Sequence, residues 1–529
     1  MPQTPISLEH QAAMVRKLQQ MLAAQQDKPA TLLETHISFV LVCGGHAYKI
    51  KKALATPFLD QSTLALRQRA CDEELRLNRR LAPRLYLAAV PVTGTADNPA
   101  FAGQGDVIDV AVKMRAFAQD GLWDAMAAHG QLGAAQVDEL VRVLAGFHAA
   151  AAVADPGGRL GSPGQVRAPL RESLDELEAL AGPASGAGRL APLRSWEAAA
   201  FERLRPVMAR RLAQGRVREC HGDLHLGNVT VIDGHSTVFD GIEFNDDFRW
   251  IDVMSELAFM AMDLHAHGLP QLAHRFVNGY LEQCGDYDGV QVLDYYLVHR
   301  ALVRAKVHWL RAAQCAAPEA AGAERAAGER YLDLALRFSR RDRAKAVLML
   351  THGFSGSGKS TLTQELLETL GAIRIRADVE RKRLAGLRPL DRGTPTLYEP
   401  AMTAATHAQL GRLAAVVLQS GYHAIVDATF LQRGQREAAR QLAAHPGVRC
   451  AVLDFDASTA LLRQRLRERA ARGADASDAD EAVLAAQMRT AEPLQDDESM
   501  PVFRRGPADA GWAPLLQWLA GEPVGALAA

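Results

Sequence analysis

The chain has 529 residues, which is too long for one ordinary hydrophobic core and predicts at least two domains. Its 60 basic and 61 acidic residues nearly cancel, so the overall charge favours neither nucleic acid nor a membrane surface as a partner. A hydrophobic content of 48% with 23% charged residues is typical of a globular protein.

The six cysteines are far apart and form no CxxC pair. This spacing argues against a zinc site or a disulfide framework and is typical of a reducing compartment. The first residues lack the apolar core of a signal peptide, and no apolar run approaches the roughly 20 residues that span a bilayer. We therefore expect a cytoplasmic protein without a membrane partner. Its oligomeric state stays open.

The first elements predict a small sheet. Residues 8–24 have the apolar spacing of a helix, and two β-rich runs within 35–52 flank Gly44 and Gly45 as in a hairpin. Residues 62–82 follow with the Leu and Arg periodicity of another helix, and "LYLAAVPVTG" and "DVIDVAVKMRAF" are two further strands. These elements predict an antiparallel sheet that carries one helix.

Helical patterns then dominate until "SRRDRAK" (339–345), where an apolar strand leads into a glycine-rich loop and helices alternate with strands. We place the domain boundary there. The expected fold is an α+β bilobal domain at 1–339, with a small lobe at about 1–115 and a helical lobe at about 116–339. An α/β domain with a mostly parallel sheet follows at 345–529. Because the connector is polar and basic, few contacts are expected to cross it.

The segment "HGDLHLGN" (221–228) places His221, Asp223 and Asn228 in this order, and "TVFDGIEF" ends a short strand with Asp240. Phosphoryl transfer needs a carboxylate that accepts the proton of the attacking hydroxyl, and oxygen ligands that hold Mg²⁺ on the phosphates. The order base, amide ligand, carboxylate ligand is the layout of a kinase catalytic loop. Asp and Asn are also common turn residues, so each of them alone is uninformative.

With a lysine-bearing hairpin upstream, this order makes the N-terminal part of the chain similar to the aminoglycoside phosphotransferase-like branch of the kinase fold, which includes choline kinases. The resemblance implies that Asp223 is the catalytic base and that Asn228 and Asp240 hold Mg²⁺. His221 then braces the loop, and His225 is interpreted as structural or adjacent to the substrate.

Two lysines compete for the contact with the ATP phosphates. Lys113 ends "VAVK", which copies a kinase tetrapeptide, whereas Lys49 in "AYKIKK" lies on the second strand of the hairpin. Position favours Lys49, because the hairpin should cover the phosphates and the following helix should supply an acidic partner. We predict Glu74 as this partner, with Glu73 as the alternative. Asp252 resembles a structural aspartate of the family and is expected to cap a helix.

A second phosphate site is predicted by "GFSGSGKS" (353–360), which fits GxxxxGK(S/T). The backbone N–H groups of such a loop cradle phosphates, while Lys359 reaches the outer phosphates and the Ser360 hydroxyl binds Mg²⁺. An apolar strand before the loop and an amphipathic helix after it provide the required context. The predicted nucleotide contacts are Gly353, Phe354, Ser355, Gly356, Ser357, Gly358, Lys359, Ser360 and Thr361.

Three further segments indicate a kinase rather than a motor ATPase. "IRIRADVERKRL" ends a strand at Asp378, and "YHAIVDATF" ends another at Asp427, a natural ligand of Mg²⁺ or water. If "LLRQRLRERAAR" is helical, Arg465, Arg469 and Arg472 share one face. This face predicts a lid over the transferring phosphates, with Arg469 as an ATP contact. A solvated Arg-rich helix is the alternative interpretation.

This C-terminal third is similar to the P-loop kinases that include gluconate kinases and the 5′-hydroxyl kinases of nucleic-acid repair. By that resemblance, Asp378 activates the acceptor hydroxyl. The whole arrangement resembles bacterial proteins that join an aminoglycoside phosphotransferase-like domain to a P-loop ATP-binding domain, and the resemblance covers nearly the full chain. We therefore predict a bifunctional, ATP- and Mg²⁺-dependent phosphotransferase that acts on a hydroxyl of a small molecule.

Two alternatives stay open. The arginine clusters at 374–383 and 463–472 suit a polynucleotide or nucleoside 5′-kinase, but the interleaved aromatic residues of a single-strand binder are missing. Alternatively, one domain is a nucleotide-binding regulator of the other, against which the complete motifs of both halves count. The sequence does not choose the acceptor among a sugar, an amino alcohol and a nucleoside.

Overall fold

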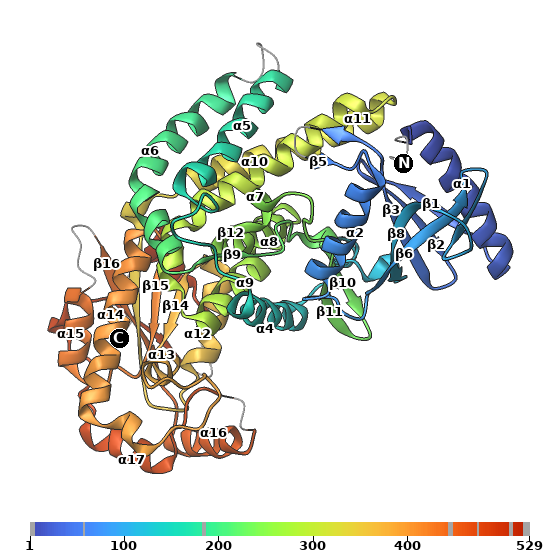
Figure 1. The fold of residues 1–529 in the computed structure, drawn as a ribbon. Helices are drawn as coiled ribbons and strands as arrows, with labels where there is room; N and C mark the ends of the chain where they lie inside the picture. Colours follow the sequence, from blue (N-terminus) through green and yellow to red (C-terminus); the bar gives the residue numbers. More distant parts are fainter. Residues whose placement is uncertain are drawn as a thin grey trace. The chain divides into compact units, whose positions relative to one another are not determined.

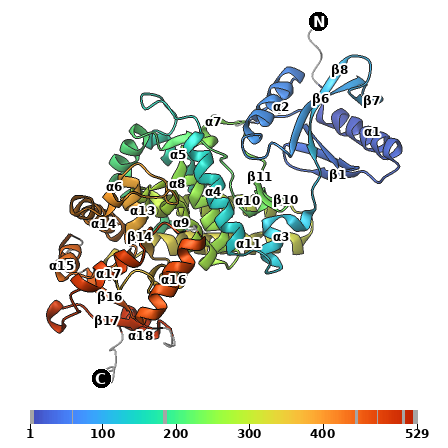
Figure 2. The same cartoon turned by 90° about the horizontal axis from the view of Figure 1, so that it is seen from below.

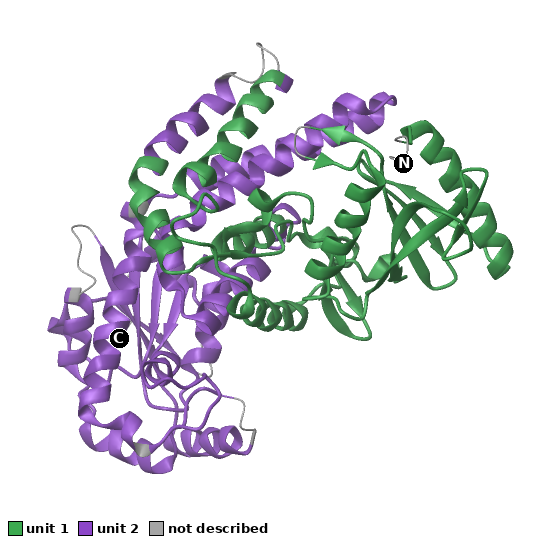
Figure 3. Cartoon of the chain, viewed as in Figure 1, with its two compact units in different colours: residues 1–179, 201–263 green, residues 180–200, 264–529 purple. Residues whose placement is uncertain are grey.

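The structure, a computed structural model, describes residues 6–56, 59–181, 187–442, 448–472, 475–506 and 511–521 (Figure 1). The chain forms two compact units, residues 1–179 with 201–263 and residues 180–200 with 264–529 (Figure 3). Within the described part of the chain, no helix has both the length and the apolar character needed to cross a bilayer.

The first unit is built on a six-stranded antiparallel sheet with the order β1-β2-β3-β8-β6-β7. The expected hairpin is present as β2–β3, with positive φ angles at Gly44 and Gly45 that suit a tight turn. A short pair, β4–β5, lies outside this sheet. The strands are β1 (Thr31–Glu34), β2 (Ser38–Cys43), β3 (His46–Lys51), β4 (Ala55–Thr56), β5 (Leu59–Asp60), β6 (Tyr86–Thr95), β7 (Asn98–Phe101) and β8 (Val107–Arg115).

Helices α1 (Leu8–Gln26) and α2 (Leu64–Asn78) cover opposite faces of this sheet (Figures 1 and 2). Ile50 of β3 packs in the cluster of α1, whereas Val112 of β8 packs in the cluster of α2. Side chains alternate between the two faces of a strand. Lys49 is paired with Val112 in the sheet and therefore lies on the face of α2.

The rest of this unit consists of helices and two short antiparallel strand pairs, β9–β12 and β10–β11. The β10–β11 pair brings the Phe239 N–H within 3.0 Å of the Asn228 carbonyl, so Asp240 follows directly beside Asn228. The elements up to α8 are α3 (Trp123–Ala128), α4 (Ala134–Ala150), α5 (Pro163–Ala181), α6 (Ala187–Ala213), β9 (Val217–Glu219), β10 (Val229–Ile232), β11 (His235–Val238), α7 (Asp246–Arg249), β12 (Trp250–Asp252) and α8 (Val253–Ala266).

The second unit contains a five-stranded, fully parallel sheet with the order β14-β15-β13-β16-β17. The glycine-rich loop follows the central strand β13, which places it at the carboxyl edge where such sheets bind ligands. The fold-class prediction is confirmed for both halves. The elements are β13 (Val347–His352), α12 (Lys359–Leu370), β14 (Ile373–Arg376), α13 (Ala377–Leu384), α14 (Pro400–Gln419), β15 (Ala424–Asp427), α15 (Arg433–Leu442), β16 (Arg449–Phe455), α16 (Thr459–Arg472), α17 (Glu481–Thr490), β17 (Val502–Arg505) and α18 (Ala513–Ala520).

Three helices from before the connector, α9 (Pro270–Cys284), α10 (Val290–Gln314) and α11 (Pro318–Ser339), belong to the same compact unit as this sheet. Asn278 Nδ2 donates to the Ala372 carbonyl at 2.9 Å, and Asn278 Oδ1 accepts from the Arg374 N–H at 2.8 Å. Arg275 Nη1 lies 2.7 Å from Glu368 Oε1. The expectation that few contacts cross the connector is therefore wrong. The sequence pattern of a helix such as α9 predicts which face is apolar, but it does not identify the element against which the helix packs.

Candidate active sites

The loop between β9 and β10 brings the predicted base and amide together. Asn228 Nδ2 donates to the main-chain oxygen of Asp223 at 2.9 Å and to its Oδ2 at 3.0 Å. Both bonds involve the amide nitrogen, so the amide oxygen of Asn228 is directed away from Asp223. His225 Nε2 lies 3.5 Å from the same Asp223 oxygen.

His221 connects this loop to the strand that precedes Asp240. Its Nδ1 accepts from the Asp223 N–H at 3.3 Å, and its Nε2 donates to the Phe239 carbonyl at 2.8 Å. A neutral ring with the proton on Nε2 satisfies both bonds. The prediction that His221 braces the loop is confirmed by these contacts.

Glu256 of α8, which the sequence analysis missed, binds the loop that carries His221 and Asp223. Its buried Oε2 accepts from the His221 N–H at 2.8 Å and from the Gly222 N–H at 2.7 Å, while Oε1 lies 2.9 Å from His148 Nε2. Burial acts to raise the pKa of Glu256, but the contacts with His148, His221 and Gly222 outweigh it and lower the pKa. The available signal was a glutamate inside an apolar helix, where a charge needs partners.

Asp252, just before α8, and Asp263, within α8, each accept a hydrogen bond from a backbone N–H. Asp252 accepts from the Met254 N–H at 2.9 Å and also pairs with Arg211 at 2.7 and 2.8 Å. The prediction that Asp252 caps a helix is confirmed, and the buried ion pair is an addition to it. Asp263, which the sequence analysis did not single out, accepts from the Leu226 N–H of the catalytic loop at 2.9 Å.

A buried set of charges joins β3, α2 and the segment after β11. Lys49 Nζ lies 2.9 Å from Glu74 Oε1 and also contacts Asp240, while Lys51 contacts both Glu74 and Glu243. Burial acts to lower the pKa of Lys49, but the carboxylates of Asp240, Glu74 and Glu243 outweigh it and raise the pKa well above its ordinary value. Lys49 on β3 therefore carries a stable positive charge next to Asp240.

The alternative residues lie elsewhere. Glu73 forms its ion pair with Arg76 at 2.7 Å, outside the Lys49 set. Lys113 is paired with Tyr48 and so lies on the opposite face of the sheet from Lys49, with its Nζ 5.8 Å from the Tyr48 ring centre. The geometry brings Lys49, and not Lys113, to the carboxylates, although the roles of both lysines stay predictions.

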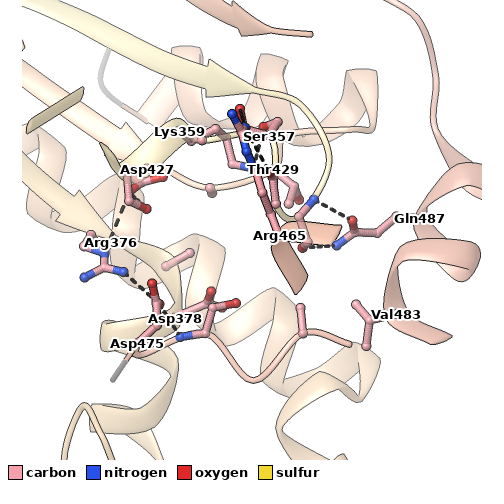
Figure 4. A pocket seen from close by; sticks show the side chains of 18 of the residues that line it. Ser357, Lys359, Arg376, Asp378, Asp427, Thr429, Arg465, Asp475, Val483 and Gln487 are labelled. Carbon is pink, nitrogen blue, oxygen red and sulfur yellow. Dashed lines mark hydrogen bonds and ion pairs between the residues drawn. The ribbon is translucent and has the colours of Figure 1, made fainter. Parts of the chain in front are cut away.

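The second site is a cavity of about 1060 Å³ at the carboxyl edge of the parallel sheet (Figure 4). In the phosphate loop, Gly353 has φ 136°, and a Cβ atom there would lie 2.5 Å from the Phe455 carbonyl, so only glycine fits. The predicted residues that line the cavity are Ser355, Gly356, Ser357, Gly358, Lys359, Ser360, Thr361, Asp378, Asp427 and Arg469.

Lys359 is folded back onto the phosphate loop. Its Nζ donates to the carbonyls of Gly353 at 2.9 Å and Phe354 at 2.8 Å. Burial lowers the pKa of Lys359 to about 8, although the carboxylates of Asp427 and Asp378 act in the opposite direction. An incoming phosphate would supply the negative charge that this ammonium group lacks.

The hydroxyl of Ser360 donates to Asp427 Oδ2 at 2.6 Å. A hydroxyl and a carboxylate side by side at the phosphate loop are the oxygen ligands that suit Mg²⁺. Arg376 lies between Asp427 and Asp475, with its Nε 3.8 Å from Asp427 Oδ2 and its Nη2 3.3 Å from Asp475 Oδ1 (Figure 4).

Asp378 does not end a strand as expected. Strand β14 ends at Arg376, and Asp378 lies in the first turn of α13. The chain turns directly from strand to helix there, which the charged run after Arg376 did not reveal. Asp378 still lines the cavity, and its carboxylate accepts from Arg381 Nη1 at 2.5 Å.

The Arg-rich segment is helical, as predicted, and forms α16. Arg465 donates to two backbone carbonyls of the phosphate loop at 3.2 and 3.1 Å, and Arg469 donates to a carbonyl before α17 at 2.6 Å. The side chain of Arg472 lies outside the described residues. From α17, Gln487 holds Ser355 through two hydrogen bonds of 3.0 Å, a contact that no sequence signal indicated.

Two protein-family models match the chain. The phosphotransferase enzyme family matches residues 58–293, and the AAA domain family matches residues 348–494. With the antiparallel-sheet domain, the parallel-sheet domain and the two charged sites described above, these matches define the class: the protein is an ATP-dependent kinase with two domains.

An uncharacterized protein of Mycobacterium tuberculosis is 31% identical over 460 residues, which are 86% of this chain and 89% of that protein. An uncharacterized protein of Mycobacterium bovis matches with the same identity and coverage. The chain belongs to the same family as these proteins, and in this chain the residues that match the phosphotransferase family precede those that match the AAA domain family.

Solved structures of kinases are similar to parts of the chain. A choline/ethanolamine kinase family protein from Mesorhizobium loti is 12% identical, with 62% of this chain and 100% of that chain covered at a TM-score of 0.38. The Mycobacterium tuberculosis APS kinase CysC is 21% identical, with 34% of this chain and 98% of that chain covered at a TM-score of 0.25.

Proposed function

We propose that the protein is a bifunctional phosphotransferase, in which each half transfers the γ-phosphate of Mg²⁺-bound ATP to a hydroxyl of a small molecule. The observation that carries this proposal is that each half brings together a lysine, side-chain oxygen atoms of the kind that suit Mg²⁺ and a further carboxylate. The two sets are Lys49, Glu74, Asn228, Asp240 and Asp223 in the first half, and Lys359, Ser360, Asp427 and Asp378 in the second.

In the first site, Asp223 takes the proton of the acceptor hydroxyl. Asn228 and Asp240 lie beside each other at the end of the β10–β11 pair and would hold Mg²⁺, which neutralises phosphate charge when it is bound. Lys49, held protonated by its carboxylates, contacts the phosphates, and Glu74 fixes its position at 2.9 Å. His221 and Glu256 keep the loop of Asp223 in place.

In the second site, the phosphate loop and Lys359 bind the nucleotide phosphates at the N-terminus of α12. Ser360 and Asp427 would hold Mg²⁺, because their oxygen atoms are already neighbours at 2.6 Å. Asp378 lines the same cavity and takes the proton of the second acceptor hydroxyl.

The arginine clusters favour a small-molecule acceptor over a nucleic acid. Arg376 is paired with Glu282 at 2.9 Å, Arg383 with Glu380 at 3.1 Å, and Arg467 with an acidic side chain of α17 at 2.7 Å. A guanidinium that already has a carboxylate partner must give up that contact before it binds a phosphate backbone.

The test uses the full chain, labelled ATP and a metabolite extract as the source of acceptors. We expect Asp223→Asn to remove one set of labelled products and Lys359→Ala to remove a different set. The double variant should make neither. If the double variant keeps wild-type phosphotransfer, both active-site assignments are wrong. If only one single variant loses product, the other domain is a regulator or an inactive partner.

A further inference from the structure

Helix α9 carries a carboxylate into the neighbourhood of the second site. Glu282 Oε1 lies 2.9 Å from Arg376 Nη1, and Glu282 Oε2 lies 3.6 Å from Arg374 Nη2. Both arginines belong to strand β14 of the parallel sheet, whereas Glu282 precedes the connector by about 60 residues of chain. The side chain of Glu282 is 22% exposed, so its charge is only weakly screened by solvent.

The position of α9 against β14 is fixed by hydrogen bonds to the backbone of this edge strand. The Asn278 side chain donates to the Ala372 carbonyl at 2.9 Å and accepts from the Arg374 N–H at 2.8 Å. The Tyr287 hydroxyl, just after α9, donates to the Arg374 carbonyl at 3.2 Å. Because these bonds join rigid elements, the Glu282 carboxylate is held in place relative to the strand.

Arg374 and Arg376 connect Glu282 to the two oxygen ligands proposed for Mg²⁺. Arg374 donates to the Ser360 carbonyl at 2.6 Å and so holds the first turn of α12. Burial lowers the pKa of Arg374, and Glu282 is the strongest attraction that opposes this effect. Arg376 lines the cavity and lies 3.8 Å from the Asp427 carboxylate.

Arg376 therefore divides its charge among three carboxylates, those of Glu282, Asp427 and Asp475. The shortest of the three contacts, 2.9 Å, is the one to Glu282. A positive charge and a metal ion compete for the same carboxylate, because both are attracted by its oxygen atoms. The more strongly Arg376 is attracted by Glu282, the less it competes with a metal ion for the Asp427 carboxylate.

We propose that Glu282 is a positioning residue of the P-loop site, which draws Arg376 toward α9 and leaves the Asp427 carboxylate to Mg²⁺. The site is then incomplete without a residue from the segment before the connector. This inference rests on the proposed function of Ser360 and Asp427 as Mg²⁺ ligands. Without the charge of Glu282, Arg376 keeps Asp427 and Asp475 as carboxylate partners and pairs more closely with Asp427.

The test is Glu282→Gln in the full chain, with Asp240→Ala present in every variant so that the P-loop site alone reports. Calorimetry measures the binding of a non-hydrolysable ATP analogue at a series of Mg²⁺ concentrations. We expect the Mg²⁺ concentration for half-maximal enhancement of binding to rise roughly tenfold, as for the loss of an outer partner of a metal ligand. The affinity for the metal-free analogue should stay unchanged.

A matched control lies in the same interface. Glu368→Gln removes the charge that pairs with Arg275 at 2.7 Å, and the Glu368 side chain is 24% exposed, close to the value for Glu282. Arg275 does not line the cavity, whereas Arg376, the partner of Glu282, does. This variant should keep the wild-type Mg²⁺ requirement. In an Arg376→Gln background, Glu282→Gln should no longer change the Mg²⁺ requirement, because the competing charge is gone.

The outcomes separate the inference from the function beneath it. If Lys359→Ala abolishes binding but Glu282→Gln keeps the wild-type Mg²⁺ requirement, the inference is wrong and the function stands. An equal rise in Glu368→Gln, or an effect that persists without Arg376, would reduce Glu282 to a packing residue. If Lys359→Ala binds the analogue as the wild type does, the proposed P-loop function itself fails.

Discussion

Two neighbouring lysines share Glu74, and their burial separates their roles. The Lys51 side chain is fully buried and contacts Glu74 and Glu243. Lys49 contacts Asp240, whose side chain is 44% exposed. Of the two lysines, Lys49 is therefore the one next to the solvent-exposed member of this group of charges. A phosphate can approach Lys49 without disturbing the buried part, which suits Lys51 to a structural role.

The lysines should therefore respond differently to truncation. Lys49→Ala should weaken nucleotide binding at the first site by more than tenfold, while Lys113→Ala should leave it nearly unchanged. Lys51→Ala removes the lysine partner of buried Glu243 and one of the two lysine partners of Glu74, and should destabilise the first unit by about 3–5 kcal/mol. Calorimetric titration in a Lys359→Ala background and thermal unfolding check these outcomes. A stronger binding defect in Lys113→Ala than in Lys49→Ala would make Lys113 the phosphate lysine.

Lys359 gives the second site a pH dependence. Its pKa is lowered from 10.5 to about 8 by burial, so the folded protein binds fewer protons than the unfolded chain between these values. Buried Lys359 thus costs stability below about pH 8, and this cost disappears as the pH rises toward 10.5. Phosphate affinity follows the opposite direction, because the ammonium charge is lost on the same rise.

We expect nucleotide affinity at this site to fall as the pH rises through about 8, with proton uptake on binding at that pH. Calorimetry in two buffers of different ionisation enthalpy measures the protons taken up. Lys359→Arg is the control, since a guanidinium stays protonated over this range and should show no uptake from this position. Equal proton uptake by both proteins would assign the titration to another group.

The site residues that were predicted from the sequence belong to local motifs or end predicted strands, even where their partners are distant, as for Ser360 and Asp427. Asp223 and Asn228 stand five positions apart and are hydrogen-bonded in the structure, as their spacing on one loop indicated. Glu256 and Glu282 were not found, because their partners lie about 35 and 94 positions away and no local pattern relates them. Charged residues on otherwise apolar helix faces were the signal that remained unused.

Among the elements, hydrophobic periodicity and turn residues were sufficient to predict the hairpin β2–β3, strand β13 with its loop, and helix α16. These elements depend mainly on residues that are neighbours in the sequence. The packing of α9 against β14 depends on two hydrogen bonds of the Asn278 side-chain amide. These bonds join segments that are distant in the sequence, so no local sequence pattern could predict them. An edge strand with open N–H and C=O groups needs such a cover.

This cover makes a prediction about Asn278. Asn278→Ala leaves the Ala372 carbonyl and the Arg374 N–H without their partner, at a cost of about 1–3 kcal/mol for each buried group. Hydrogen exchange over β14 should accelerate strongly, while exchange over β16, on the other side of the sheet, changes little. Glu368→Gln is the comparison, since a partly exposed ion pair contributes at most about 1 kcal/mol. Unchanged hydrogen exchange over β14 would show that the Asn278 hydrogen bonds do not stabilise this edge strand.

At the scale of the whole molecule, the polar connector and the compact units divide the chain at different places. The family matches end at residue 293 and begin again at 348, on either side of the predicted boundary at 339–345. The second compact unit, however, already includes residues 264–339. The contacts that Asn278 and Glu282 make with β14 place their helix with the parallel sheet. A fragment ending near residue 340 would therefore lack the contacts that Asn278 and Glu282 make with β14.

The two proposed sites also predict how many nucleotides the chain binds. A hairpin-covered cleft and a helix N-terminus hold ATP in different ways, and each set has its own lysine and metal ligands, so one nucleotide cannot satisfy both. Two equivalents of a non-hydrolysable ATP analogue should bind per chain in the presence of Mg²⁺. Lys359→Ala should remove one equivalent, Lys49→Ala the other, and the double variant both. Calorimetry gives the stoichiometry directly. A single equivalent in the wild-type chain, lost in only one of the two single variants, would leave one working kinase and make the other domain a degenerate partner.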